Sequence, residues 1–193
     1  LLNRAGSFIL IFLPLYLTTD LKLSTTFATN CMGIFGFGSM TGALIGGQLA
    51  DQIGRRFVMM LALFGGAIML FVLGAVREPW QIMLCVFVFS TLVDMYRPAA
   101  SAMIADLVPP EQRAEAFGLM YSLLNLGFAV AGVAGGFIAE YSFTWLFWGD
   151  GITTGLYGLV ILLFISETSA TSPQHDENPV SYTHLRAHET TCH

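Results

Sequence analysis

The stretch Gly47-Gln48-Leu49-Ala50-Asp51-Gln52-Ile53-Gly54-Arg55-Arg56 decides how this chain folds, because it joins two long apolar segments. Lipid cannot satisfy the backbone groups of a polar turn, so a turn between two membrane spans lies at a membrane surface. Gly54 allows a positive φ in that turn at little steric cost. The adjacent Arg55 and Arg56 place the turn on the cytoplasmic side by the positive-inside rule.

Two acids end apolar segments near this surface. Asp51 ends the helix before the turn, where the helix macrodipole is negative and an acid is unfavourable. We therefore expect its carboxylate to have a partner, either an arginine or the N-terminus of another helix, and the alternative is a solvated turn carboxylate. Asp106 ends a later apolar segment in the same way, and Arg55 or Arg56 is its expected partner.

The composition is that of an integral membrane protein. Hydrophobic residues make up 55% of the chain and charged residues 11%, against about 25% charged in a soluble domain. Lys22 is the only lysine and there is no basic cluster, so the sequence indicates no nucleic-acid partner. Cys31 and Cys85 lie in apolar segments as small packing residues. No disulfide framework, metal-ligand set or cofactor motif is predicted.

Six segments reach the length of about 20 apolar residues that a spanning helix needs. Their predicted ranges are 1–17, 27–50, 57–76, 80–105, 114–139 and 143–165. The polar connections at 18–22, 77–79 and 108–113 are short, which makes consecutive spans antiparallel. The chain opens without Met inside an apolar segment and shows no signal-peptide cleavage site, so we expect it to be cut within its first helix.

The turn resembles the loop between helices two and three of major facilitator superfamily transporters, which has the pattern G-x-x-x-D-R-x-G-R-R. Gln52 stands where the family has an arginine. The matching positions are Gly47, Asp51, Gly54, Arg55 and Arg56. The segment 108–113, with Pro110 at a helix start and Glu111 in the first turn, resembles the family's loop between helices four and five.

The resemblance implies an all-α integral membrane fold. The chain would be the N-terminal six-helix half of a twelve-helix protein, with each half built from two inverted three-helix repeats. The resemblance covers residues 1–167. Residues 168–179 are polar, as at the start of the cytoplasmic linker between halves. Residues 180–193 resemble translated sequencing-adaptor sequence, so we predict a non-native tail. His184 and His188 in it are spaced like metal ligands, but nothing there would orient them.

Small residues recur every four positions in two spans, a pattern that lets another helix approach closely. In the family these two helices pack against the C-terminal half, and packing within this half is the alternative. The rows are Gly38, Gly42 and Gly46 in the second span, and Gly127, Ala131 and Gly135 in the fifth, beside Gly132 and Gly136. The fifth span also resembles the antiporter motif G-x8-G-x3-G-P-x2-G-G, with Ala131-Gly132 in place of Gly-Pro.

Ionisable residues inside spans are costly and mark functional sites by default. Those in this chain are Arg4, Asp94, Arg97 and Asp150. In the fourth span Ser90, Asp94, Arg97 and Ser101 form one polar face, which must look into a cavity or at other helices. The alternative is a structural ion pair between Asp94 and Arg97 at i,i+3. Tyr121 and Asn125 form a weaker polar pair in the fifth span, whereas Asp150 could sit near the outer interface.

The resemblance implies a secondary transporter of the bacterial inner membrane. The run Tyr96-Arg97-Pro98-Ala99 looks most like the multidrug-efflux branch, which implies proton coupling through Asp94 or Asp150. The implied partners are the lipid bilayer, a small-molecule substrate, protons and the C-terminal six-helix half. The implied gating residues are Gly47, Asp51, Gly54, Arg55, Arg56, Asp106 and Arg113.

Two alternatives remain for the function. One is a uniporter or a sugar or metabolite symporter, which shares the loop motif. The other, from a different class, is a six-helix scaffold or an intramembrane enzyme. All four histidines lie after residue 167, so no serine–histidine dyad is available inside the spans.

Overall fold

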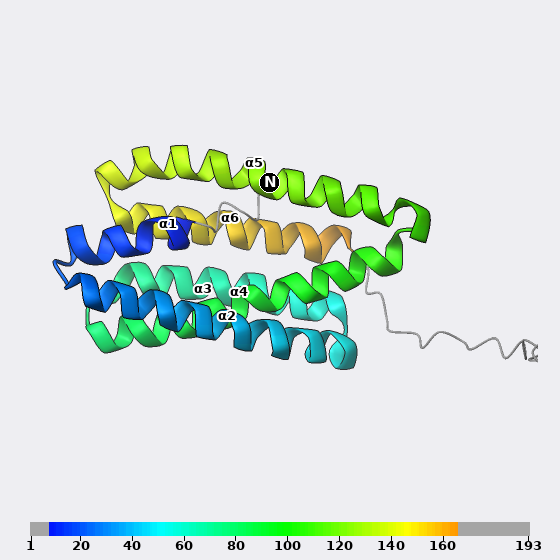
Figure 1. The fold of residues 1–193 in the computed structure, drawn as a ribbon, viewed down its shortest axis with the longest axis horizontal. Helices are drawn as coiled ribbons and strands as arrows, with labels where there is room; N and C mark the ends of the chain where they lie inside the picture. Colours follow the sequence, from blue (N-terminus) through cyan, green and yellow to red (C-terminus); the bar gives the residue numbers. More distant parts are fainter. Residues whose placement is uncertain (1–7, 166–193) are drawn as a thin grey trace, which may run out of the picture.

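The computed structural model describes residues 8–165, and this part of the chain is built from helices (Figure 1). The predicted all-α class is therefore confirmed. The elements are α1 (Phe8–Leu15), the π-helix η2 (Tyr16–Asp20), α2 (Thr25–Ile53), α3 (Arg55–Ala75), α4 (Pro79–Leu107), the 3₁₀ turn η3 (Pro110–Gln112), α5 (Arg113–Tyr141) and α6 (Phe143–Phe164).

Helices α2 to α6 begin and end close to the five predicted spans from residue 27 onward. The first span differs, because α1 continues through η2 to Asp20 and replaces the first part of the predicted loop at 18–22. The Thr18 hydroxyl donates to the carbonyl of Pro14 at 2.9 Å and the Thr19 hydroxyl to that of Leu15 at 2.7 Å. These bonds satisfy backbone carbonyls in the wider π-helical turn. The two threonines in the sequence were not enough to predict this turn.

Four of the helical segments are long and apolar enough to cross a membrane. They are Arg55–Ala75, Pro79–Leu107, Pro110–Tyr141 and Phe143–Phe164. Helix α2 has 29 residues, but its glycine, threonine and serine residues lower its hydropathy, and the described part of α1 has 8 residues. Membrane-spanning capacity is therefore shown for four of the six predicted spans.

Helix α4 is central to the packing, since α2 and α3 both lie against it, and α3 in turn packs on α6. One buried apolar cluster joins the first helix to this group through Tyr16, Leu70, Phe89 and Phe147. A second cluster near the other end of the helices contains Leu63, Met95, Met103 and Ile161. Lipid tails are as apolar as these side chains, so close packing contributes more to helix association than removal from water does.

The glycine row of α2 packs against α4 within the described part of the chain. A β-carbon at Gly42 would overlap the backbone carbonyl of Thr91, and one at Gly46 would lie 2.6 Å from the Cα of Met95. Gly38 lies equally close to α4 at Ser90. For α2, the structure therefore favours the alternative of packing inside this half over packing against further chain.

Helix α5 is the most loosely packed long helix and runs along the upper edge of Figure 1, with α6 beneath it. The residues it buries are Gly127, Ala131 and Gly135, and Ala131 packs with Phe12 and Leu146. That row therefore also packs against described helices of this chain. In contrast, β-carbons at Gly132 and Gly136 would meet open space, beside large apolar side chains that are exposed.

A single residue, Gly54, connects α2 to α3. Its φ of 101° lies in the region that L side chains rarely adopt, which confirms the backbone conformation expected from the sequence. The Gly54 carbonyl then accepts the first bond of α3, from the Val58 amide at 3.3 Å. This turn brings Arg55 and Arg56 to the start of α3, beside the end of α2.

Candidate functional site

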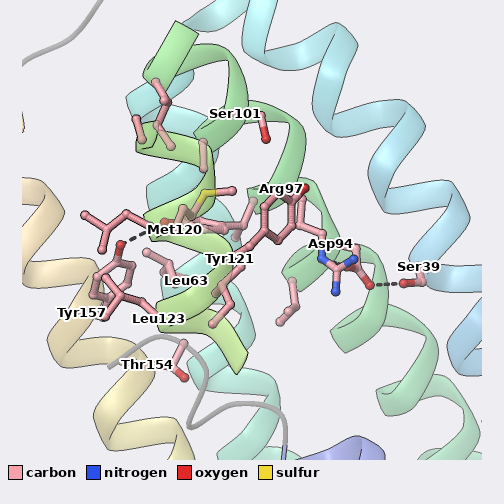
Figure 2. Close-up of a pocket in the computed structure, with 18 of the residues that line it drawn as sticks. Ser39, Leu63, Asp94, Arg97, Ser101, Met120, Tyr121, Leu123, Thr154 and Tyr157 are labelled. Atoms are coloured by element: carbon pink, nitrogen blue, oxygen red, sulfur yellow. Dashed lines mark hydrogen bonds and ion pairs between the residues drawn. The ribbon is translucent and has the colours of Figure 1, made fainter. Parts of the chain in front are cut away.

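A cavity of about 580 Å³ lies between α4, α5 and α6, with further lining from α2 and α3 (Figure 2). Most of its wall is apolar, including Phe35, Leu63, Phe89 and Met120. The polar side chains that line it are Ser39, Asp94, Tyr96, Arg97, Ser101, Tyr121, Thr154 and Tyr157. A drug-sized ligand occupies a pocket of this size and composition, about 300–1,000 Å³.

Asp94 and Arg97 form an ion pair on the cavity wall. The Arg97 Nε lies 3.2 Å from Asp94 Oδ1, and the Ser39 hydroxyl of α2 donates to the other carboxylate oxygen (Figure 2). The next residue is Pro98, which has no N–H, so the helix cannot bond the carbonyl of Asp94 in the usual way. The carboxylate is thus held from two helices.

The polar face predicted for the fourth span divides into two parts. Asp94, Arg97 and Ser101 line the cavity, as expected for a face that looks into a cavity. Ser90 is instead fully buried against α2 at Gly38, and its hydroxyl donates to the carbonyl of Phe87 at 3.0 Å. Close packing of α2 on α4 covers this end of the face.

Tyr96 of α4 and Tyr157 of α6 meet across the cavity. Their hydroxyl oxygens are 2.9 Å apart, and the rings lie edge to face with centroids 6.2 Å apart. The sequence did not point to Tyr157, Thr154 or Ser39 as members of a cavity wall. The available signal was the spacing of Asp150, Thr154 and Tyr157 at i, i+4 and i+7, which places them on one side of α6.

The remaining sequence candidates lie in different places. Tyr121 lines the cavity, whereas Asn125 is exposed and is not part of the lining. Arg4 lies outside the described residues. The structure therefore brings together three of the six candidates for substrate or proton coupling, namely Asp94, Arg97 and Tyr121.

Asp150 is buried in α6, with 1% of its surface exposed, and is not part of the cavity lining. Among the residues that the structure describes, neither of its carboxylate oxygens has a partner of good hydrogen-bond geometry. The Thr154 hydroxyl, one turn along the helix, gives this carboxylate polar support. The side chain of Asp150 is therefore enclosed by the surrounding helices.

Charged residues at the other end of the helices form a network around the Gly54 turn. Arg55 Nη1 lies 2.9 Å from Asp106 Oδ2, which is the partner expected for that acid, and Arg55 Nη2 lies 4.0 Å from Asp51. Arg56 donates to the carbonyl of Leu162 in α6. Arg113 Nε donates to the carbonyl of Val108 at 3.1 Å, which closes the loop before α5.

Asp51 is more solvated than the dipole argument predicted. Its side chain is 72% exposed, whereas that of Arg55 is 11% exposed. Its contact with Arg55 at 4.0 Å is at the limit of an ion pair, because the shorter bond goes to Asp106. The geometry here is close to the solvated turn carboxylate that was the alternative.

Among the described residues, no three histidine, cysteine, aspartate or glutamate side chains cluster as metal ligands do. The histidines of the predicted tail, like the whole of residues 166–193, lie outside the described part of the chain.

Apolar helices of spanning length around a charged cavity define a multi-pass integral membrane protein. The family model of the Major Facilitator Superfamily matches residues 2–189, so the chain belongs to that superfamily. The chain is 25% identical over 177 residues to a transporter of the same superfamily type, YqjV of Bacillus subtilis, covering 91% of this chain. It is 30% identical over 153 residues to the quinolone resistance protein NorA of Staphylococcus aureus, covering 79% of this chain.

The chain spans 43% of the length of YqjV and 38% of that of NorA, about two fifths of each relative. Among solved structures, it is similar to the peptide transporter POT in complex with sulfate, with a TM-score of 0.69 and 22% identity. That match covers 83% of this chain and 34% of the peptide transporter. A second structure of that transporter, with alafosfalin, gives a TM-score of 0.67. At this identity the likeness shows the fold.

Proposed function

We propose that this chain is the N-terminal six-helix half of a secondary active transporter, which moves a small molecule across the membrane by alternating access, in proton-coupled efflux. The observation that carries the proposal is the cavity of about 580 Å³ with the Asp94–Arg97 pair on its wall. Charges at this depth in apolar helices are costly and are kept where they serve binding or transport. The relatives named as transporters support the same class.

The arrangement of the lining supports the inverted-repeat architecture. Helices α2 and α3 belong to the first three-helix group and α4 to α6 to the second, and both groups contribute to the wall. In transporters built from such repeats the substrate site lies at the interface of the two halves. Under this proposal the missing wall of the cavity comes from a C-terminal six-helix half, and residues 168–179 begin the linker to it.

The network at the Gly54 turn is the proposed conformational gate. Arg55 lies between the acids at the ends of α2 and α4, so its pairs tie the α2–α3 turn to α4. A motion of the turn relative to α4 would break the 2.9 Å contact between Arg55 and Asp106 first. The exposed carboxylate of Asp51 then remains available to Arg55, or to a cation from further chain.

Asp94 is the favoured proton carrier of the two acids in the spans, because it lines the cavity and Asp150 does not. Reconstitution of the full-length protein into proteoliposomes tests this, with a quinolone as the first compound because of the name of the Staphylococcus aureus relative. We expect uptake or release that is driven by an imposed pH gradient and lost when the gradient is dissipated.

Other outcomes of that experiment separate the alternatives. Transport that runs down the substrate gradient alone indicates a uniporter, and accumulation on the side to which protons flow indicates a symporter. A protein that binds but moves nothing supports the scaffold alternative, and turnover of a compound without transport supports an intramembrane enzyme. The full reading frame gives an independent test, since six further spans favour the transporter.

A further inference from the structure

The Asp94–Arg97 pair presents its two charges to the cavity unequally. The Arg97 side chain is 62% exposed, whereas that of Asp94 is 10% exposed. Each oxygen of Asp94 already has a partner, Arg97 Nε on one and the Ser39 hydroxyl on the other. In Figure 2, Ser39 lies on one side of the carboxylate, and Arg97 and Tyr121 lie on the other. The charged group that a ligand in the cavity can reach is therefore the guanidinium.

Arg97 uses one edge of its guanidinium for Asp94. Its ion pair with that residue runs through Nε, and within residues 8–165 no hydrogen bond from Nη1 or Nη2 is formed. The terminal amino groups of an arginine form a planar fork that fits the two oxygens of a carboxylate, or of another oxyanion, in a bidentate pair. The free donors of Arg97 therefore match an anionic or strongly accepting group.

The wall around Arg97 is rich in aromatic rings, from Phe35, Phe89, Tyr96, Tyr121 and Tyr157. Aromatic rings pair edge to face or offset with the rings of a ligand. A guanidinium with free donors, set in an aromatic wall, therefore fits a compound that combines a flat apolar body with one oxyanion.

We propose that this cavity binds aromatic compounds that carry a carboxylate or a comparable oxyanion, held by the terminal amino groups of Arg97. The inference rests on the proposed function for the role of the cavity and adds the chemical class of its ligand. An aromatic cation is the competing occupant, because Asp94 is an acid. It would have to compete with Ser39 and Arg97 for the oxygens of Asp94, whose side chain is 10% exposed against 62% for Arg97.

Direct binding to the full-length protein in lipid nanodiscs tests the proposal by calorimetry. The three probes are naphthoate, naphthamide and naphthylmethylammonium, which share one ring system and differ in the charge of its substituent. We expect naphthoate to bind about tenfold or more tighter than naphthamide, because a charge-assisted hydrogen bond is stronger than a neutral one. Naphthylmethylammonium should bind most weakly.

Variants test whether the preference for naphthoate over naphthamide comes from Arg97. Arg97→Gln should bring naphthoate to within about threefold of naphthamide, and Arg97→Lys should keep part of the difference, since lysine supplies the charge without the fork. Lys22→Gln, which removes a cation outside the cavity, is the matched control and should keep the full preference. Asp94→Asn removes the negative charge beside Arg97 and should strengthen the preference, because that charge repels an anionic ligand.

Equal binding of the three probes, or no binding of naphthoate, overturns the proposal. So does tightest binding of naphthylmethylammonium that Asp94→Asn weakens, because the carboxylate would then be the accessible group. These are binding measurements, so a protein that prefers naphthoate but transports nothing contradicts the proposed function alone. A protein that transports other compounds without the preference contradicts this inference alone.

Discussion

At the scale of single residues, the two acids Asp94 and Asp150 differ in the partners that offset their charge. Asp94 has an arginine and a serine as partners, while Asp150 is buried with 1% exposure and has no partner of good geometry among the described residues. An unpaired charge in an apolar environment is far more costly than a paired one. The two acids should therefore respond differently to the same substitution.

We expect Asp94→Asn to destabilise the protein by about 1–3 kcal/mol, because it disrupts the hydrogen bonds at a partly buried carboxylate. Asp150→Asn should leave the stability unchanged or raise it, because it removes a buried charge that no cation among the described residues offsets. Thermal unfolding of the two variants in the same detergent measures both effects. A larger loss for Asp150→Asn than for Asp94→Asn would show that Asp150 has a partner beyond residues 8–165.

The two acids around Arg55 give a second comparison. Asp106→Asn removes the 2.9 Å partner of an arginine that is 11% exposed, so we expect a loss of about 1–2 kcal/mol, less than for a fully buried pair. Asp51→Asn should leave stability nearly unchanged, because that side chain is 72% exposed.

If Asp51 acts in gating, Asp51→Asn should nevertheless largely abolish transport at normal expression. Thermal unfolding and transport in proteoliposomes, measured on the same preparations, separate the two effects. Wild-type transport by Asp51→Asn would show that Asp51 does not act in gating. An unchanged unfolding temperature for Asp106→Asn would show that the Arg55–Asp106 ion pair does not stabilise the protein.

At the scale of the elements, packing between helices depends on where the glycines face. The row of α2 meets the backbone of α4, whereas a β-carbon at Gly33 of the same helix would have nothing within 4 Å. Helix α2 therefore contains glycines that its contact with α4 requires and glycines that take no part in that contact. A β-carbon has opposite consequences at the two kinds of position.

We expect Gly42→Ala to destabilise the protein strongly, because the new β-carbon would overlap the carbonyl of Thr91 and push α2 away from α4. Gly33→Ala, the matched control on the same helix, should be neutral or stabilising by up to about 1 kcal/mol, since alanine favours the helix. Folded yield and thermal unfolding in detergent measure both. Equal tolerance at the two positions would mean that α2 does not pack on α4 as described.

At the scale of the whole molecule, α5 is the long helix that packs least against the other described helices. Its inner row is buried against α1 and α6, yet Gly132 and Gly136 face open space beside the exposed Val133 and Phe137. An exposed apolar face is normal against lipid, but small residues in a row are typical of a helix contact. In the proposed full-length transporter this second row packs against the C-terminal half.

We therefore expect Gly136→Leu to lower the stability of the full-length protein, although a side chain at this position meets nothing within residues 8–165. Val133→Leu, on the exposed side of the same helix, is the control and should have little effect. Thermal unfolding of the full-length protein in nanodiscs is the measurement. Wild-type stability of Gly136→Leu would indicate that lipid, rather than further chain, covers this row.

The sequence alone determined the class of fold and the ends of most helices. Long apolar segments separated by short polar turns predict spanning helices, since lipid leaves backbone groups no other partners. Gly54 with Arg55 and Arg56 specified a turn with positive φ, because few other residues adopt it. The i,i+3 spacing likewise gave the contact of Asp94 with Arg97 as the alternative to a purely functional face, because that contact depends on one helix.

Only the tertiary structure decided what lies across from each residue. Whether a glycine row meets α4 or open space, and whether Asp150 is buried, depends on how helices distant in sequence are placed together. The cavity depends on it too, since Ser39, Arg97 and Tyr157 come from α2, α4 and α6. The period of a helix gives the face on which a side chain lies, but contains no information about the neighbour of that face.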